Sequence, residues 1–275
     1  MERARWTDGY LAALGLAPDE PSTGLLGELV RRHVATFAFS SVGPRLGDDL
    51  PLDVESLYDR IVVRRRGGYC FEQNGLMYEV LRDLGFAVDL CLARVIHNQD
   101  THPALTHRVS IVRVDGVDAV VDVGFGPQGP PLPVALAPPA PSVPLSGVQR
   151  AYRVHEAVPG QFHMQVDTDE GWYSLYRFER VRYGQADCEV GHFYSHRHPE
   201  ATFVNNLVAS LILDDEVRSL RNREYRVLRP GGEERQVIQD AATLRALLGD
   251  ALALHVSEAE SRRLFEELRP DAAAG

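Results

Sequence analysis

The sequence predicts an α+β protein built from three stretches with different residue patterns. Apolar residues recur at helical spacing in residues 1–85, whereas residues 86–183 are rich in β-forming residues separated by turn signals. Residues 187–275 mix both patterns. We therefore expect three domains, covering residues 1–85, 86–186 and 187–275.

Three helices are expected in the first stretch. Apolar side chains recur every three or four residues after Ser22, after Asp53 and between Cys70 and Gly85. Serine and aspartate accept hydrogen bonds from the free N–H groups of a helix start, and glycine commonly follows a helix end. The last of these helices is therefore expected to begin at Cys70 and to end just before Gly85.

The middle stretch is expected to form strands. Two β-rich runs are joined by Asp115-Gly116, a dipeptide that favours the tight turn of a β-hairpin. Residues 127–145 contain too many prolines for a helix or a central strand, so we interpret them as a long, partly extended surface loop. Further strands are expected within residues 86–96 and 151–179.

The last stretch combines helices and strands. Residues 198–213 are interpreted as a turn followed by a helix or a buried segment. Residues 224–238 have the pattern of a second hairpin, which turns at Pro-Gly-Gly. Two helices are expected at 240–249 and 257–268, the second with a serine and a glutamate spaced as in a capping box.

The composition excludes several classes of protein. The chain has 44% hydrophobic and 25% charged residues, the proportions of a globular rather than a disordered protein. No run approaches the roughly 18 apolar residues that span a bilayer, and the N-terminus lacks the pattern of a signal peptide. We therefore expect a cytoplasmic protein that does not bind membranes. The net charge of −10 argues against a nucleic-acid partner, and the absence of lysine excludes Schiff-base catalysis.

Cys70 has the sequence context of a reactive thiol. It follows a double glycine at the predicted start of a helix, where free N–H groups and the helix dipole favour a thiolate. The arginines at 64–66 are expected to add positive potential nearby. Cys91 and Cys188 lack this context and are interpreted as structural, and three widely spaced cysteines do not form a disulfide framework.

His107 and Asp122 are expected to supply a base and its orienting group. A two-residue turn at 115–116 places Val109 opposite Asp122, and His107 lies two residues beyond Val109 on the same face. Diagonal neighbours on one face of a hairpin lie within reach of a histidine–carboxylate hydrogen bond. A solvent-facing aspartate and an unrelated histidine are the alternative interpretation.

Neither a metal nor a permanently bound cofactor is expected. Gly124-Phe-Gly126 lacks the third glycine and the following helix of a dinucleotide-binding fingerprint. Three histidines resemble a ligand cluster and leave metal binding as an alternative, because zinc sites usually add a cysteine or carboxylate at set spacing and Cys188 is close by: His192, His196 and His198.

Four motifs occur together in this chain. They are Arg-Gly-Gly-Tyr-Cys-Phe-Glu-Gln-Asn at 66–74, Thr-His at 106–107, Asp-Val-Gly-Phe-Gly at 122–126 and His-Pro-Glu-Ala-Thr-Phe at 198–203. In combination they resemble the arylamine N-acetyltransferase family, over nearly the whole chain. The resemblance implies an N-terminal helical bundle, a central β-barrel and a C-terminal α/β lid.

The resemblance also implies an enzyme with a catalytic triad of Cys70, His107 and Asp122, arranged as in cysteine proteases. In this family an acyl group moves from acetyl-CoA, a co-substrate, to the cysteine and then to an aromatic amine or hydrazine. We expect His107 to hold Cys70 as a thiolate and later to take a proton from the amine. Asp122 is expected to orient His107 and to stabilise its cation.

Six further residues are expected to bind the substrates, with core packing as the alternative role for each. Those flanking the motifs could wall an apolar acceptor pocket: Tyr69, Phe71 and Phe125. By resemblance, three more line the acceptor and thioester cleft: Phe39, Val95 and Phe203.

The chain also departs from the family pattern. Residues 38–42 read Ala-Phe-Ser-Ser-Val where the family usually has Pro-Phe-Glu-Asn-Leu. Pro127 stands where the family usually has a glycine, and the region after Val95 has His97 and lacks the customary large aromatic residue. One branch of the family, the ansamycin amide synthases of antibiotic biosynthesis, takes a polyketide from an acyl carrier protein and closes a macrolactam. The small residues at 40–42 could open a cleft for such a substrate, so an amide synthase is the alternative function. A cysteine protease and a non-catalytic binding protein are further alternatives.

Overall fold

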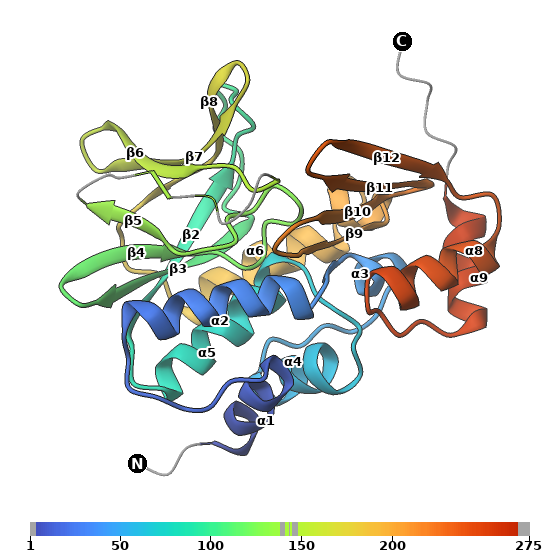
Figure 1. Cartoon of the computed structure of the whole chain (residues 1–275), viewed down its shortest axis with the longest axis horizontal. Helices are drawn as coiled ribbons and strands as arrows, with labels where there is room; N and C mark the ends of the chain where they lie inside the picture. Colours follow the sequence, from blue (N-terminus) through green and yellow to red (C-terminus); the bar gives the residue numbers. More distant parts are fainter. Residues whose placement is uncertain (1–3, 138–140, 143, 145–147, 269–275) are drawn as a thin grey trace.

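Helices form one end of the molecule, a seven-stranded sheet curls up beside them, and a five-stranded sheet with two helices lies opposite (Figure 1). The computed structural model describes residues 4–137, 141–142, 144 and 148–268. The arrangement confirms the predicted α+β class, with N-terminal helices, a nearly closed barrel and a C-terminal α/β unit. Within the described residues, no helix is long and apolar enough to cross a membrane.

Three of the N-terminal helices, α2, α4 and α5, begin where the sequence predicts, whereas the starts of α1 and α3 were not predicted. The Ser22 hydroxyl accepts a hydrogen bond from the N–H of Leu25 (3.2 Å), and the Asp53 carboxylate accepts one from Ser56 (2.9 Å). The apolar faces of these helices share one core around the last of them. The elements are α1 Arg5–Leu14, α2 Thr23–Thr36, α3 Val42–Leu46, α4 Val54–Tyr58, the π-helical turn η1 Asp59–Val63, and α5 Cys70–Asp83.

The barrel is an antiparallel sheet in the order β5-β4-β3-β2-β8-β7-β6, and its edge strands β5 and β6 contact each other. The predicted hairpin register is confirmed, since Ser110 pairs with Val121 and Ile111 with Val120. The strands are β2 Ala87–Val95, β3 His107–Val114, β4 Val117–Val121, β5 Val134–Ala137, β6 Tyr152–Val158, β7 Gln161–Thr168 and β8 Gly171–Glu179.

The interpretation of residues 127–145 as loop throughout is wrong at one point. Residues 134–137 form β5, which pairs with β4 as an edge strand. Proline is tolerated at the start of an edge strand, because no neighbour needs its missing N–H there. Residues 138–140, 143 and 145 lie outside the described residues.

The C-terminal unit contains a sheet in the order β1-β9-β10-β11-β12. The expected hairpin at 224–238 is present, whereas β10 was not predicted. Residues 198–213 form a short helix and then a strand, because periodicity alone cannot distinguish a buried strand from a buried helix. The elements are α6 Gln185–Arg197, α7 Thr202–Asn205, β9 Val208–Ile212, β10 Val217–Arg221, β11 Glu224–Arg229, β12 Gly232–Val237, α8 Ala241–Ala246, η2 Leu247–Ala251 and α9 Glu258–Glu267.

The first strand of this sheet comes from the N-terminal stretch. β1, Phe39–Ser40, pairs with β9 and also forms a parallel bridge from Phe39 to Gly68. The Ser40 N–H donates to the Gly68 carbonyl (2.9 Å). The C-terminal sheet therefore reaches the turn that precedes Cys70.

A buried histidine joins three of the N-terminal helices. His33 Nδ1 lies 2.8 Å from the Tyr10 hydroxyl, and Nε2 lies 2.8 Å from Gln73 Oε1. Gln73 donates its amide to Ala38 (2.7 Å), so its oxygen accepts from His33 Nε2–H. Burial lowers the pKa of His33 to about 4, although the hydrogen bond to Gln73 opposes the shift.

We expect the free energy of unfolding to fall as the pH drops from 6.5 to about 4, in part through His33. In this window the unfolded chain binds a proton at His33 and the folded chain does not, so acid favours unfolding. The contribution reaches about 3 kcal/mol, at roughly 1.4 kcal/mol per pH unit. Urea unfolding at several pH values should show a steeper dependence in the wild type than in His33→Gln. Equal slopes would contradict the assignment, and His155→Gln, at an exposed position of β6, is the matched control.

Candidate active site

Cys70 is the first residue of α5, as the sequence predicts. The double glycine before it is required by close packing. Gly67 has φ of +64°, and a Cβ at this position would lie 2.5 Å from the Ala38 carbonyl oxygen. The thiol is 3% exposed and lies 3.5 Å from the Thr106 carbonyl oxygen. The free N–H groups of the first helical turn therefore lie next to this thiol.

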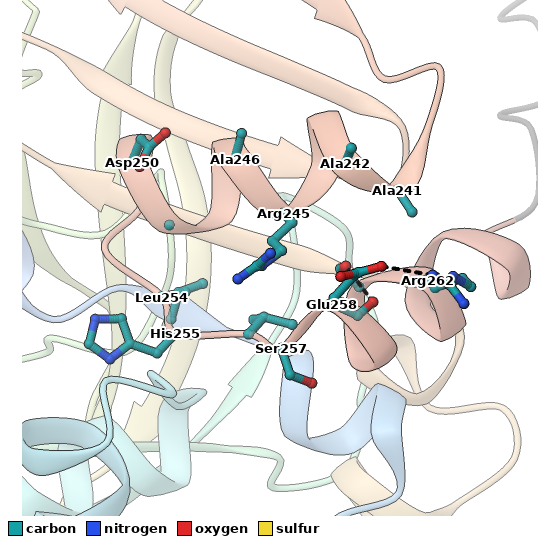
Figure 2. Close-up of a pocket in the computed structure, with 13 residues that line it drawn as sticks. Ala241, Ala242, Arg245, Ala246, Asp250, Leu254, His255, Ser257, Glu258 and Arg262 are labelled. Atoms are coloured by element: carbon teal, nitrogen blue, oxygen red, sulfur yellow. Dashed lines mark hydrogen bonds and ion pairs between the residues drawn. The ribbon is translucent and has the colours of Figure 1, made fainter.

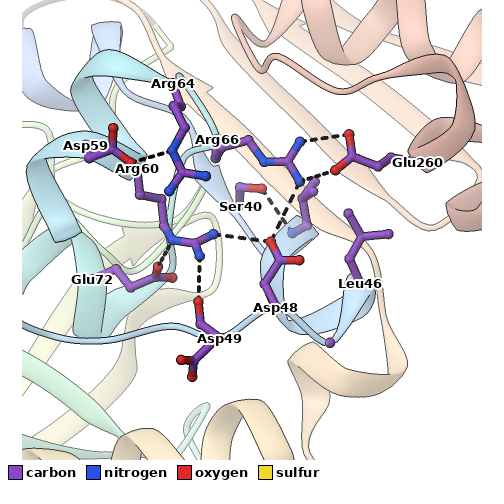
Figure 3. Close-up of polar contacts among 12 residues, drawn as sticks. Ser40, Leu46, Asp48, Asp49, Asp59, Arg60, Arg64, Arg66, Glu72 and Glu260 are labelled. Atoms are coloured by element: carbon purple, nitrogen blue, oxygen red, sulfur yellow. Dashed lines mark hydrogen bonds and ion pairs between the residues drawn. The ribbon is translucent and has the colours of Figure 1, made fainter.

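A buried ion pair supports the turn that carries Cys70. Glu72 Oε1 lies 3.2 Å from Arg60 Nε (Figure 3). Glu72 Oε2 accepts a hydrogen bond from the N–H of Tyr69 (3.2 Å). Arg60 also donates to the Asp49 carbonyl (2.9 Å). Burial raises the pKa of Glu72 to about 7, although the charge of Arg60 opposes this shift.

The arginines before the double glycine do not act as free charges. Arg64 pairs with Asp59 (2.5 Å) and Arg66 with Glu260 of α9 (2.8 Å) (Figure 3). Arg65 lies over an aromatic ring, 4.9 Å from its centroid. The expectation that Arg64 and Arg66 add positive potential at Cys70 is wrong, because carboxylates compensate their charge.

His107 and Asp122 meet as the hairpin register predicts. His107 Nε2 lies 2.8 Å from Asp122 Oδ2, and both residues are almost completely buried. Asp122 Oδ1 accepts two more hydrogen bonds, from Asn74 Nδ2 (2.9 Å) and from the N–H of Gly124 (2.9 Å). The interpretation of Asp122 as a solvent-facing residue is therefore excluded.

His107 and Asp122 shift each other's pKa. Burial lowers the pKa of His107, but the charge of Asp122 and hydrogen bonds to Asp122 and Cys70 outweigh it and raise the pKa. Burial raises the pKa of Asp122, but the charge of His107 and hydrogen bonds from its neighbours outweigh it and lower the pKa. Since Nε2 is bonded to Asp122, Nδ1 is the nitrogen of His107 that remains to bond Cys70. The site thus favours an imidazolium next to a carboxylate.

Asn74 holds Asp122 in place, and the sequence analysis gave it no role. Its amide nitrogen bonds Asp122 and the Arg108 carbonyl (2.6 Å), and its oxygen accepts from the N–H of Val123 (2.8 Å). Residues four apart lie on one face of a helix. The spacing of Asn74 from Cys70 is therefore the signal that could have revealed it.

Gly124 allows the helix and the barrel to approach each other. A Cβ at this position would lie 2.7 Å from Cys70 Cα and 2.7 Å from Asn74 Nδ2. Any larger residue would push β4 away from α5. The glycine therefore fixes the separation between the thiol and its base.

A cleft of about 600 Å³ opens onto Cys70 and His107. Tyr69 and Phe71 do not line it and are fully buried, contrary to expectation. Successive residues of a helix point about 100° apart, so the neighbours of Cys70 face other parts of the core. The four remaining predicted substrate-binding residues do line the cleft: Phe39, Val95, Phe125 and Phe203.

The positions at which the chain departs from the family pattern differ in their relation to the cleft. His97 and Pro127 line the cleft. Ser40, Ser41 and Val42 are fully buried and lie outside its lining. The expectation that small residues at 40–42 open the cleft is therefore wrong.

The histidine cluster near Cys188 is engaged in hydrogen bonds. His192 Nδ1 contacts the Tyr69 hydroxyl (2.5 Å), and its Nε2 contacts the Leu50 carbonyl (2.7 Å). His196 Nδ1 contacts the carbonyl of His192 (2.6 Å). Across the described residues, no group of three histidine, cysteine or carboxylate side chains could hold a metal ion.

A second hollow, of about 820 Å³, lies between α8 and α9 (Figure 2). Arg245 points into it, and Arg262 pairs with Glu258 at its edge (2.8 Å). The hollow contains none of the three predicted catalytic residues. The chemistry described above therefore lies in the cleft at Cys70.

Cys70 is expected to react with iodoacetamide much faster than the other two cysteines. Burial raises the pKa of Cys91 to about 12 and also raises the pKa of Cys188. Neither of them lines the cleft, whereas Cys70 does. Alkylation of the folded protein near pH 6, followed by peptide mapping, measures the three rates. Equal labelling of all three thiols would contradict this expectation, and labelling in urea provides the control for intrinsic reactivity.

Comparisons with known proteins agree with this geometry. A family model described as N-acetyltransferase matches residues 24–261. Arylamine N-acetyltransferase of Mycobacterium tuberculosis is 35% identical over 255 residues, which cover 90% of this chain and 88% of the relative. The structure of the Salmonella typhimurium enzyme superposes with a TM-score of 0.89 at 28% identity, covering 96% of this chain and 99% of that one. The structure of the Mycobacterium marinum enzyme in complex with CoA superposes with a TM-score of 0.86 at 30% identity, covering 95% of this chain and 99% of that one. The chain therefore belongs to the arylamine N-acetyltransferase family and is an enzyme of that type.

Proposed function

We propose that this enzyme moves an acetyl group from acetyl-CoA through Cys70 to the nitrogen of an aromatic amine, in a ping-pong sequence. The observation that carries the proposal is that Cys70 and His107 line one cleft, while the buried Asp122 carboxylate bonds the far nitrogen of His107. The M. marinum relative in complex with CoA supports the choice of donor. In this proposal residues 1–85 supply the nucleophile, residues 86–186 supply the base and the carboxylate, and residues 187–275 form the lid.

In the first half-reaction the Cys70 thiolate attacks the carbonyl carbon of acetyl-CoA. The bond from this carbon to Cys70 Sγ forms, and the bond to the CoA sulfur breaks. His107 gives its proton to the departing thiolate, so CoA leaves as a thiol. One thioester replaces another, and the step is therefore close to energetically balanced in both directions.

In the second half-reaction the amine nitrogen attacks the acetyl group on Cys70. The carbon–nitrogen bond forms, the bond to Cys70 Sγ breaks, and His107 takes the proton that the nitrogen loses. Asp122 stabilises the resulting imidazolium. Phe39, Phe125 and Phe203 provide aromatic walls for an apolar amine.

An amide synthase is the alternative function for this cleft. Its triad chemistry would be the same, but no feature of the described cleft favours a long polyketide. The relatives compared above carry the name arylamine N-acetyltransferase. An acetyl donor and a small acceptor are therefore the substrates to try first.

Mass spectrometry after incubation with acetyl-CoA tests the proposal. We expect one acetyl group on the peptide that contains Cys70, and its loss when a small aromatic amine is added. The same experiment on Cys188→Ala, a buried thiol outside the cleft, should give the same labelling. Failure of any acyl thioester to label Cys70 would overturn acyl transfer. Cyclisation of a carrier-borne thioester bearing its own arylamine, without reaction of acetyl-CoA, would identify an amide synthase instead.

A further inference from the structure

We propose that Arg221 binds a phosphate of the thioester donor, the one that ends its pantetheine arm. This inference rests on the proposed function and identifies the part of the cleft that recognises the donor. CoA and the prosthetic group of an acyl carrier protein share the chemistry concerned, a phosphate esterified to the pantetheine arm about 13 covalent bonds from the thioester sulfur. The observations that carry the proposal are the position of Arg221 in the cleft, its charge balance and its separation from Cys70.

One face of the C-terminal sheet forms a wall of the catalytic cleft. Alternate residues of β10 line it, as expected for side chains on one face of a strand: Val217, Ser219 and Arg221. Alternate residues of the neighbouring strand β11 line it as well: Glu224, Arg226 and Leu228. The same hollow therefore contains the reactive thiol and the arginine.

Among the described residues, no carboxylate forms an ion pair with Arg221. Within the described part of the chain, no hydrogen bond or ion pair engages its guanidinium group. Glu224 lies opposite Arg221 in the strand register, but both its oxygens bond Arg226 (2.8 and 2.9 Å). Glu224 also lies 3.5 Å from Arg235, and Glu233 pairs with Arg235 at 2.6 Å.

Counted together with Arg235 beside it, this end of the cleft holds one more arginine than glutamate. Two arginines and two glutamates line the cleft, at 221, 226, 224 and 233, and Arg235, outside the lining, pairs with both glutamates. Such a surplus is notable in a protein with a net charge of −10. A guanidinium without a carboxylate partner is suited to bind a phosphate through two parallel hydrogen bonds.

The sheet provides a scale for the separation between Arg221 and the thiol. The backbone passes from Gly68 to β1, then to β9 and to β10, through paired residues. Three strand spacings of about 4.8 Å give roughly 14 Å between Gly68, in the turn before Cys70, and Ser219 of β10, and Arg221 lies two residues further along the strand. An extended arm of about 13 bonds spans ~15 Å, at the ~3.5 Å per three bonds of an extended chain. A donor whose sulfur lies at Cys70 can therefore place its phosphate at Arg221.

Steady-state kinetics with three acetyl donors test the assignment: acetyl-CoA, acetyl-phosphopantetheine and acetyl-pantetheine, which lacks the phosphate. With Arg221→Gln we expect KM to rise about tenfold or more for both phosphorylated donors, as for the loss of a hydrogen bond to a charged group. The kcat values and the reaction with acetyl-pantetheine should be unchanged. Arg229→Gln is the matched control, because Arg229 lies on the same sheet, outside the cleft, and pairs with Glu216 and Glu234.

Each other outcome overturns the assignment. An unchanged KM for acetyl-CoA would remove Arg221 from the donor site, and an equal rise with acetyl-pantetheine would indicate a general structural effect. A rise confined to acetyl-CoA would place the contact at a phosphate that the short arm lacks. Comparison of acetyl-CoA with an acetylated carrier protein identifies the source of the arm, and the loss at Arg221 is expected with whichever of them reacts. If neither acetyl-CoA nor any other acyl thioester labels Cys70 in the wild type, the proposed function fails, and this result is distinct from a failure at Arg221.

Discussion

Replacing Cys70 by serine is expected to abolish acyl transfer, with kcat reduced by at least about 10⁴-fold. The side chain changes by one atom, so the packing at the start of α5 is retained. A hydroxyl loses its proton far less readily than a thiol, and His107 is already protonated beside Asp122 because its pKa is raised. The variant therefore has neither an ionised nucleophile nor a free base. The measurement is the rate of acetylation of a small aromatic amine by acetyl-CoA.

The control for this substitution is Cys91→Ser, the same change at a buried thiol of the barrel. It should leave kcat close to that of the wild type. It is expected to lower the thermal stability, because a hydroxyl replaces the less polar thiol in an apolar core. Activity of Cys70→Ser within tenfold of the wild type would show that another residue carries the acyl group. Near-ultraviolet circular dichroism of both variants verifies that they are folded.

The positions of the three residues of the proposed triad could be predicted because each of them follows a local rule. A double glycine before an apolar repeat marks a helix start, and an Asp-Gly turn sets the register that brings His107 to Asp122. These rules act over fewer than about 20 residues. The meeting of Cys70 with His107 depends on packing between α5 and the barrel, and here the family resemblance supplied what the pattern alone did not.

Other parts of the site depend on contacts between distant segments, which a residue pattern does not contain. Tyr69 and Phe71 could not be separated from cleft residues, because their burial depends on where α6 packs. The sequence predicts a free cation at Arg66, because its partner Glu260 lies 194 residues away in the chain. The participation of β1 in the C-terminal sheet was equally hidden, since a two-residue strand has no periodicity of its own.

Replacing Asp122 by asparagine is expected to reduce kcat by about 10³- to 10⁴-fold in a folded protein. Asp122 Oδ1 accepts hydrogen bonds from Asn74 and Gly124, so the amide oxygen of the new side chain must stay at that position. The amide nitrogen then faces His107 Nε2 and donates to it. The ring proton is forced onto Nδ1, which is the nitrogen that must act as the base for Cys70.

The same substitution removes the negative charge that raises the pKa of His107, so this pKa should fall. The rate of alkylation of Cys70 against pH reports the change, because the thiolate loses the imidazolium that stabilises it at neutral pH. A merely structural effect would lower the thermal stability without moving this profile. The matched control is Asp118→Asn, at an ion-paired position of the neighbouring hairpin turn, which should leave the profile in place. If Asp122→Asn retains most of its activity while folded, Asp122 does not orient His107, and the base must be held by another group.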